Sequence, residues 1–350
     1  LADTKGESHL YRVDLATQAV AAVTTGPRAI RQADIDDAAG VITYIANDAT
    51  HADDIYVADA AGRNERRLTR TNDALLAQID LQPIERIPFK SVDGWMVDGF
   101  LMKPAGWQTG KSYPMILTIH GGPNGMFGVD FSPEFRAMAA RGFAVFFTNP
   151  RGSSGYGEAF QRGVALEWGG KAYQDIMAGV DAVLAAHAWI DRGRLGVMGH
   201  SYGGFMTNWI VGQTERFKAA VSLAGISDFV SVEGLRDGYY GHAKDFGGDL
   251  FRSFDPYWKY SPIRNAGNVK TPLLILHGDA DLRVPLSQGE EMFRAVRHFG
   301  VTSELVIFPR EPHSLRREPR HQLEVLQWTL YWLDRFVNGN SSAPRPNEIK

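Results

Sequence analysis

The sequence predicts an α/β fold in which a doubly wound, mostly parallel sheet follows a smaller all-β segment. Over residues 83–338, short apolar segments alternate with segments of helical periodicity. The apolar segments lack the polar alternation of a half-exposed strand, which indicates burial on both faces and therefore mostly parallel pairing. Before residue 83 the pattern is different, because short strands recur there without helical segments between them.

An internal repeat with an offset of 45 residues marks the N-terminal segment. The matching positions are Leu10 and Ile55, Tyr11 and Tyr56, Asp14 and Asp59, Ala16 and Ala61, and Val23-Thr24 and Leu68-Thr69. Each copy reads as a strand, a polar turn and a second strand, and a period of about 40–45 residues is typical of one β-propeller blade. Residues 1–82 therefore predict an incomplete β-propeller of about two blades. The alternative is a pair of unrelated hairpins with similar composition.

The elements of the second segment follow in order. Asp93-Gly94 predicts a hairpin turn, and buried strands are expected at 115–119, 143–147, 195–198, 219–223, 273–276 and 304–308. Helical spacing joins Ile176, Val180, Val183 and Leu184, and again Leu323, Leu326, Leu330 and Leu333. Residues 83–338 are thus expected to form the α/β domain, and residues 339–350 a polar tail.

Composition excludes several classes of protein. The 37 Lys and Arg residues against 40 Asp and Glu give a net charge of −3, so no basic surplus indicates a nucleic-acid partner. No apolar run reaches the ~18 residues that span a bilayer, and the absence of cysteine excludes disulfides and a thiol nucleophile. We expect a cytoplasmic protein without a membrane partner. Export stays open, because Leu1 is not a methionine and the N-terminus looks truncated.

Gly199-His200-Ser201-Tyr202-Gly203 fits the pattern G-x-S-x-G. This pattern makes a sharp strand-to-helix turn that lifts a serine hydroxyl clear of the backbone in α/β-hydrolases. An apolar strand at 195–198 leads into it and a helical segment at 205–210 follows, which is the required setting. Ser201 is therefore the candidate nucleophile, and the alternative is a structural turn with a buried serine.

A serine hydroxyl needs a base to take its proton, and in α/β-hydrolases the acid and then the histidine follow the serine in the chain. Asp279 and Asp281 both follow the strand at 273–276, and spacing alone does not separate them. His313 stands in a short loop after the next strand, so we prefer it as the base over His277, His298 and His321.

His120-Gly121-Gly122-Pro123 follows the strand at 115–119. An N–H group of this glycine-rich loop and the N–H of Tyr202 could together form an oxyanion hole, although a plain turn would have the same sequence. The sequence contains no H-E-x-x-H, no phosphate-binding loop and no complete dinucleotide motif. We therefore expect neither a metal nor an organic cofactor.

Four segments together resemble the prolyl oligopeptidase family of serine peptidases, within it the branch of acylaminoacyl-peptidases and dipeptidyl-peptidases. They are His120-Gly121-Gly122-Pro123, Asn149-Pro150-Arg151-Gly152-Ser153-Ser154-Gly155-Tyr156-Gly157, Gly199-His200-Ser201-Tyr202-Gly203-Gly204 and His277-Gly278-Asp279-Ala280-Asp281-Leu282-Arg283-Val284-Pro285. The resemblance runs through nearly the whole chain and implies an α/β-hydrolase domain preceded by a propeller.

The resemblance also implies roles for individual residues. Ser201 would be the nucleophile, Asp281 rather than Asp279 the acid, and His313 the base. The N–H groups of Tyr202 and Gly122 would form the oxyanion hole. Arg283 would lie near the substrate backbone, and a hydrophobic pocket for the P1 side chain would be lined by Ile226, Phe229, Val230 and Tyr240.

The expected function is hydrolysis of short peptides through an acyl-enzyme, without a cofactor. Family members carry a complete propeller, so we expect the remaining blades, as part of the same parent polypeptide, to be a partner of this chain. A homo-oligomer is a further possibility. The alternatives are a carboxylesterase of the same fold and a non-catalytic fragment that acts as a scaffold.

Overall fold

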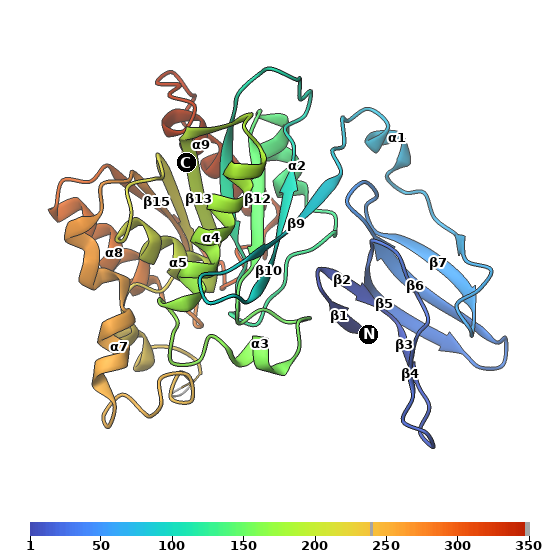
Figure 1. The fold of residues 1–350 in the computed structure, drawn as a ribbon. Helices are drawn as coiled ribbons and strands as arrows, with labels where there is room; N and C mark the ends of the chain where they lie inside the picture. Colours follow the sequence, from blue (N-terminus) through green and yellow to red (C-terminus); the bar gives the residue numbers. More distant parts are fainter. Residues whose placement is uncertain (239–240, 347–350) are drawn as a thin grey trace.

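The computed structural model describes residues 1–238 and 241–346, and Figure 1 shows an N-terminal all-β part beside a larger α/β part. One sheet of the N-terminal part contains, in spatial order, β1 (Ala2–Thr4), β2 (Glu7–His9), β5 (Ala29–Asp36), β6 (Val41–Asn47), β7 (Asp54–Asp59) and β8 (Arg66–Arg67). The strands β3 (Tyr11–Val13) and β4 (Val20–Ala22) pair separately as an antiparallel hairpin. The short helix α1 (Asp73–Leu76) follows β8.

The 45-residue repeat has a structural counterpart in the hairpins β3–β4 and β7–β8. In the first, the Leu10 N–H donates to the Thr24 hydroxyl at 3.0 Å, and in the second the Ile55 N–H donates to the Thr69 hydroxyl at 2.9 Å. The next ladder bonds, Val23 N to Leu10 O and Leu68 N to Ile55 O, also correspond. Because β5 and β6 have no upstream copy within the chain, the part over residues 1–82 contains one four-stranded antiparallel unit and the hairpin of a second.

The α/β part is built on a mixed sheet of eight strands among the described residues, in the order β16-β15-β14-β13-β11-β12-β10-β9. Its strands are β9 (Ile84–Lys90), β10 (Met96–Met102), β11 (Tyr113–Ile119), β12 (Ala144–Asn149), β13 (Ile190–His200), β14 (Ala219–Leu223), β15 (Leu273–Gly278) and β16 (Ser303–Phe308). The strands from β11 to β16 run parallel, and β10 is antiparallel to both of its neighbours. The α/β fold predicted from the sequence is confirmed.

Helices cover both faces of this sheet. The helices described in the α/β part are α2 (Pro133–Ala140), α3 (Glu158–Arg162), α4 (Lys171–Ala186), α5 (Tyr202–Val211), α6 (Phe229–Glu233), α7 (Phe254–Tyr260), the 3₁₀ helix η1 (Pro262–Asn268), α8 (Leu286–His298) and α9 (Pro319–Phe336). Successive side chains of a strand point to opposite faces. Accordingly, Leu117 belongs to the core cluster with Ile176 of α4, whereas Ile116 belongs to the cluster with Trp332 of α9. Both faces of the sheet are therefore buried, in agreement with the lack of polar alternation in its strands.

The N-terminal sheet meets the α/β part through main chain as well as side chains. The turn between β1 and β2 contacts two loops of the α/β part. The Val129 N–H, in the loop after β11, donates to the Gly6 carbonyl at 3.0 Å, and the Lys5 N–H donates at 3.1 Å to the carbonyl of Gly155, in the loop after β12. A Cβ on Gly128 would lie 1.8 Å from the Gly6 carbonyl oxygen, so this approach excludes any side chain there.

The C-terminal segment returns to the fold as far as residue 346. Ala343 is buried in the cluster around α9, and the Arg345 guanidinium lies 5.0 Å from the centre of the Trp328 ring and pairs with Glu304. The segment predicted as a polar tail is thus packed against the α/β part over its described residues. No helix in the described part of the chain has the length and apolar character needed to cross a membrane.

Candidate active site

The parallel strands bring the candidate catalytic groups to one edge of the sheet. Ser201 follows β13, Gly122 follows β11, Asp281 follows β15 and His313 follows β16. Because these strands are neighbours or near neighbours and run in the same direction, their carboxyl ends lie side by side. The loops that follow these strands can therefore be short and still bring the four positions together.

Ser201 lies at a sharp turn between β13 and α5. Its φ of 61° and ψ of −117° are unusual for a residue with a side chain, and its N–H donates to the Leu223 carbonyl of β14 at 2.9 Å. A Cβ on Gly199 would lie 2.5 Å from the carbonyl carbon of Gly203, so the turn can close only without a side chain at 199. The strained serine conformation is typical of a nucleophile held clear of the backbone.

Ser201, His313 and Asp281 form a continuous chain of hydrogen bonds. The Ser201 Oγ lies 2.8 Å from the His313 Nε2, and the His313 Nδ1 lies 2.7 Å from the Asp281 Oδ2. A carboxylate only accepts hydrogen bonds, so the His313 Nδ1 carries the hydrogen and the Nε2 is free to accept the serine proton. The arrangement has the geometry of a serine nucleophile with its base and orienting acid.

The two candidate acids lie in different surroundings. The Asp281 side chain is buried, and its Oδ1 accepts hydrogen bonds from the N–H groups of Arg283 and Val284, both at 2.9 Å. These bonds turn the other carboxylate oxygen toward His313. Asp279 is exposed and its carboxylate accepts from the Arg310 N–H, at the start of the loop that carries His313. Of these two carboxylates, that of Asp281 hydrogen-bonds to His313 and that of Asp279 hydrogen-bonds to the Arg310 N–H.

The two candidate oxyanion donors flank the serine. Tyr202 is the first residue of α5, where N–H groups have no acceptor within the helix. The Gly121-Gly122 segment lies against the serine turn, since a Cβ on Gly121 would be 3.4 Å from the Ser201 Cβ. Within the described part of the chain, no hydrogen bond engages the N–H of Tyr202 or of Gly122. Both donors are thus available to an oxygen developing charge beside Ser201.

Two further histidines, the buried His120 and the partly buried His200, lie beside the site without belonging to the hydrogen-bonded chain. Burial lowers the pKa of His120 to about 4, and its Nε2 lies 2.8 Å from the Ser153 Oγ. Burial, and next the neighbouring His313, lowers the pKa of His200 to about 4, and its Nε2 lies 2.7 Å from the His313 carbonyl oxygen. Both imidazoles are therefore neutral at neutral pH.

The predicted substrate-binding residues have mixed placements. Arg283 is half-exposed and its guanidinium pairs with the Asp237 carboxylate, Nε to Oδ1, at 2.6 Å. Ile226 and Phe229 are buried in the main core cluster, and the partly buried Val230 packs against it. Tyr240 lies outside the described residues.

Phe229 belongs to an aromatic cluster that reaches the serine turn. The Trp168 ring lies 5.4 Å from Phe229 and 5.2 Å from Tyr202, measured between ring centres. Phe246 also packs against Phe229, at 5.0 Å. Aromatic surface thus begins one residue from Ser201.

The histidines that competed with His313 lie elsewhere. His277 is buried beside Asp281 and donates its Nε2 hydrogen to the Val284 carbonyl at 2.8 Å, while His298 is exposed at the end of α8. His321 bonds through its Nδ1 to Glu311 at 2.8 Å. Its ring, Glu311 and Glu318 bring ligand atoms within 4.8 Å of one another, but the Glu311 carboxylate already accepts from the N–H groups of Arg317 and Glu318. This cluster fixes the start of α9.

The sequence did not predict the buried ion cluster that Arg151 forms with Asp175 and Asp93. The Arg151 guanidinium is bound on one side by Asp175, with N–O distances of 2.7 and 2.8 Å, and on the other by Asp93, with two of 2.8 Å. Arg151 and Asp175 are almost fully buried. Arg151 stands in one of the family motifs, which is the only signal in the sequence that could have singled it out. The cluster holds the segment after β12 that supports the His120 ring through Ser153.

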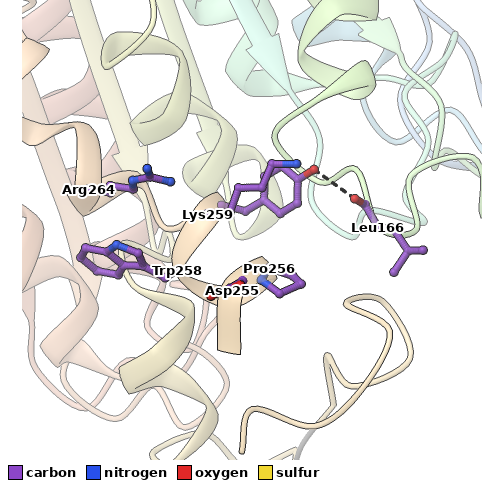
Figure 2. A pocket seen from close by; sticks show the side chains of 7 residues that line it. Leu166, Asp255, Pro256, Trp258, Lys259 and Arg264 are labelled. Carbon is purple, nitrogen blue, oxygen red and sulfur yellow. Dashed lines mark hydrogen bonds between the residues drawn. The ribbon is translucent and has the colours of Figure 1, made fainter. Parts of the chain in front are cut away.

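Two surface cavities in the described part of the chain lie away from the candidate catalytic residues. A cavity of about 410 Å³ is lined by Leu166 and by residues of α7 and η1, including Asp255, Trp258 and Arg264 (Figure 2). A second, of about 350 Å³, lies between the β1–β2 turn and the loop after β11. Neither is lined by Ser201, Asp281 or His313, so the hydrogen-bond geometry and not a cavity locates the candidate site.

The chain is similar in sequence to known peptidases. The sequence profile described as "Prolyl oligopeptidase family" matches residues 129–340. The chain is 44% identical over 279 residues to "Uncharacterized peptidase YuxL" of Bacillus subtilis, covering 79% of this chain and 42% of that protein. It is 32% identical over 255 residues to "Dipeptidyl-peptidase 5" of Schizosaccharomyces pombe, covering 71% of this chain and 37% of that protein.

Solved structures give the same result. The Pyrococcus horikoshii acylaminoacyl peptidase superposes with a TM-score of 0.89 at 31% identity, over 99% of this chain and 55% of that one. An acylaminoacyl peptidase in complex with Z-Gly-Gly-Phe-chloromethyl ketone also gives a TM-score of 0.89, at 32% identity, over 99% of this chain and 54% of that one. The chain thus spans about half the length of the relatives that it matches. The resemblance seen in the sequence is confirmed: the chain belongs to the prolyl oligopeptidase family.

Proposed function

We propose that the chain provides the catalytic part of a serine peptidase that hydrolyses short peptides. The observation that carries the proposal is the pair of hydrogen bonds at 2.8 and 2.7 Å that link Ser201, His313 and Asp281. A serine hydroxyl is inert near neutral pH without such a base. Family membership makes peptide bonds the expected substrate class.

In this mechanism, the Ser201 Oγ attacks the substrate carbonyl carbon while its proton moves to the His313 Nε2. Asp281 keeps the His313 Nδ1 protonated and stabilises the imidazolium that forms. The carbon–nitrogen bond then breaks, and His313 returns the proton to the leaving amine. Water attacks the resulting acyl-enzyme by the same route in reverse and releases the acid product.

The N–H groups of Tyr202 and Gly122 would stabilise the negative oxygen of the tetrahedral intermediate. Their support is their position beside Ser201 and their lack of another hydrogen-bond partner among the described residues. Loss of one such donor typically costs about 10²–10³ in rate.

For substrate selection, we assign the P1 side chain to the aromatic cluster of Trp168, Phe229 and Phe246. Its proximity to Tyr202 supports this, and an apolar or aromatic P1 residue would fit. The relatives named dipeptidyl-peptidase and acylaminoacyl peptidase favour removal of a short unit from a peptide's N-terminus. Arg283, beside Asp281, would bind the substrate backbone.

We further assign residues 1–82 to the last blades of a β-propeller, residues 83–338 to an α/β-hydrolase domain and residues 339–350 to a C-terminal segment of polar composition, which packs against that domain over its described residues. The paired hydrogen bonds of Thr24 and Thr69 support the blade repeat. The relatives' greater length supports further blades upstream in the parent polypeptide. The intact mass of the protein from its native source tests this, and a mass that corresponds to 350 residues alone would contradict it.

The catalytic assignment is tested with Ser201→Ala in the longest polypeptide available. The variant should lose both labelling by a fluorophosphonate and turnover of aminoacyl and N-acyl-aminoacyl p-nitroanilides, whereas the exposed-serine control Ser112→Ala should keep both. Labelling that persists in Ser201→Ala would refute Ser201 as nucleophile. A higher turnover of simple acyl esters than of peptides by the wild type would instead favour a carboxylesterase.

A further inference from the structure

Two hydrogen bonds join the serine turn to the loop that carries His313. One is the bond between the His313 Nε2 and the Ser201 Oγ, at 2.8 Å. The other runs from the ring of His200, the residue before the serine, to the main-chain carbonyl of His313, at 2.7 Å. The two imidazole rings lie 4.9 Å apart between centres and are tilted by 41°. The second bond is not part of the proton-transfer chain.

The direction of the second bond is fixed by chemistry. A carbonyl oxygen only accepts, so the His200 Nε2 must carry the hydrogen. Burial, and next the neighbouring His313, lowers the pKa of His200 to about 4, while the main-chain bond and Asp281 act in the opposite direction and Arg316 adds to the lowering. His200 therefore donates as a neutral imidazole near neutral pH. It places no positive charge beside His313, which itself has to become an imidazolium during catalysis.

The main chain of the loop that carries His313 makes few other hydrogen bonds to the serine turn among the described residues. Arg310 and Leu315, which flank its centre, both have positive φ values, of 63° and 54°, and such backbone is held only by surrounding contacts. Those contacts come from the opposite side: the Ala280 N–H donates to the Glu311 carbonyl, and the Glu311 carboxylate accepts from α9. Among the described residues, the His200 ring makes the one hydrogen bond from the serine turn to the main chain of this loop.

We propose that His200, the residue directly before the serine of the G-x-S-x-G turn, is a positioning residue that sets the distance between Ser201 and His313. Since His200 is covalently bonded to Ser201 and hydrogen-bonded to the His313 backbone, it ties the base to the nucleophile independently of the Ser201 hydroxyl. The tie persists when Ser201 is acylated and its own hydrogen bond to His313 is lost. This proposal rests on the proposed function, because His200 can have a positioning role only if Ser201 and His313 are the nucleophile and the base.

The test compares His200→Leu, which removes the donor, with His200→Gln, whose amide nitrogen can reach the same carbonyl. The exposed His298→Leu serves as the matched control. Because small misplacements of a reacting group cost on the order of 10²-fold, His200→Leu should lower kcat about 10- to 100-fold with KM within about twofold. His200→Gln should recover most of the loss. The deshielded proton resonance of the His313 Nδ1–H should broaden in His200→Leu and return in His200→Gln.

Other outcomes are informative. If His200→Leu folds with wild-type melting behaviour and keeps kcat within about twofold, the positioning role is refuted. If His200→Gln is as slow as His200→Leu, the hydrogen bond is not the cause and the proposal also fails. If His200→Leu does not fold, His200→Gln against His200→Met, compared by the rate of fluorophosphonate labelling, decides in the same way. Absence of labelling in the wild type would instead refute the proposed function.

Discussion

Gly203 lies so close to the strand β11 that a Cβ on it would be 2.0 Å from the carbonyl oxygen of Ile119. That oxygen belongs to main chain, which cannot move aside without shifting the loop of Gly121 and Gly122. The second glycine of the G-x-S-x-G turn is therefore required by the contact between α5 and the loop after β11. One residue couples the serine turn to the candidate oxyanion loop.

Gly203→Ala is accordingly expected to remove most activity. The forced displacement should also lower stability by about 1–3 kcal/mol, as is typical of overpacking. Hydrolysis of a p-nitroanilide and urea unfolding measure the two effects. In the control Gly234→Ala, the new Cβ meets its nearest neighbour at 3.9 Å, so near-wild-type values are expected. Equal behaviour of the two variants would contradict the steric argument.

Asp281 and Asp279 provide a matched pair within one loop. Asp281 bonds to the His313 Nδ1, whereas Asp279 bonds to the Arg310 N–H, so only the first can hold the histidine tautomer. Asp281→Asn should lower kcat by roughly 10⁴-fold, as loss of the orienting carboxylate does in serine proteases. Asp279→Asn should cost only a few-fold. Steady-state kinetics of both variants decide, and a comparable loss in the two would reject this distinction.

Asp175 neutralises the buried Arg151 guanidinium through N–O distances of 2.7 and 2.8 Å. Asp175→Ala leaves a buried charge with only the Asp93 side satisfied, and removing one partner of a buried pair typically destabilises by about 3–5 kcal/mol. Asp181 lies on the same helix α4, exposed and paired with Arg216. Asp181→Ala should change the free energy of unfolding by less than about 1 kcal/mol. Urea titrations measure both free energies of unfolding, and similar losses in the two variants would contradict this prediction.

Asp93 makes the stability depend on pH. Hydrogen bonds from Arg151 lower the pKa of Asp93 from 3.8 to about 2. A carboxyl whose pKa is depressed by folding contributes stability above the unfolded value, near pH 4, and loses it as pH falls through the folded value. Because the Asp93 side chain is partly exposed, solvent screening reduces this contribution to about 1 kcal/mol or less.

The measurement compares wild type with Asp93→Asn. The difference in urea midpoint should be largest near pH 6 and should shrink as the pH falls from about 4 to about 2, because the carboxyl of the unfolded chain is protonated first and that of the folded protein last. The exposed Asp37→Asn should show no such trend. A difference that stays constant with pH would mean that Asp93 acts through something other than its charge.

Sequence patterns were sufficient for the α/β sheet and for family membership, since apolar strands and the four motifs are local features. The strand predicted at 219–223 coincides with β14, and the predicted helical residues Ile176 and Leu184 lie in α4. The choice between Asp279 and Asp281 could not come from spacing. It depends on N–H groups of Arg283 and Val284 that turn one carboxylate toward His313.

Other contacts were beyond sequence reasoning because their partners are far apart in the chain. His200 reaches His313 across more than a hundred residues, and Arg151 meets Asp93 and Asp175 from two different elements. The N-terminal repeat could be seen in the sequence, but the pairing of β1 and β2 with the sheet of β5 to β8 could not. Such pairings depend on tertiary packing, which produces no periodic pattern in the sequence.

The meeting of Gly6 with Gly128 has a mechanical consequence. Main chain touches main chain there, so no side-chain rotation can absorb a relative displacement of the two sheets. Either the segment leading away from Gly122 moves together with the β1–β2 turn, or the bond from Val129 breaks. Substitutions within the first ten residues, remote from Ser201 in sequence, are therefore able to alter how firmly an oxyanion would be held.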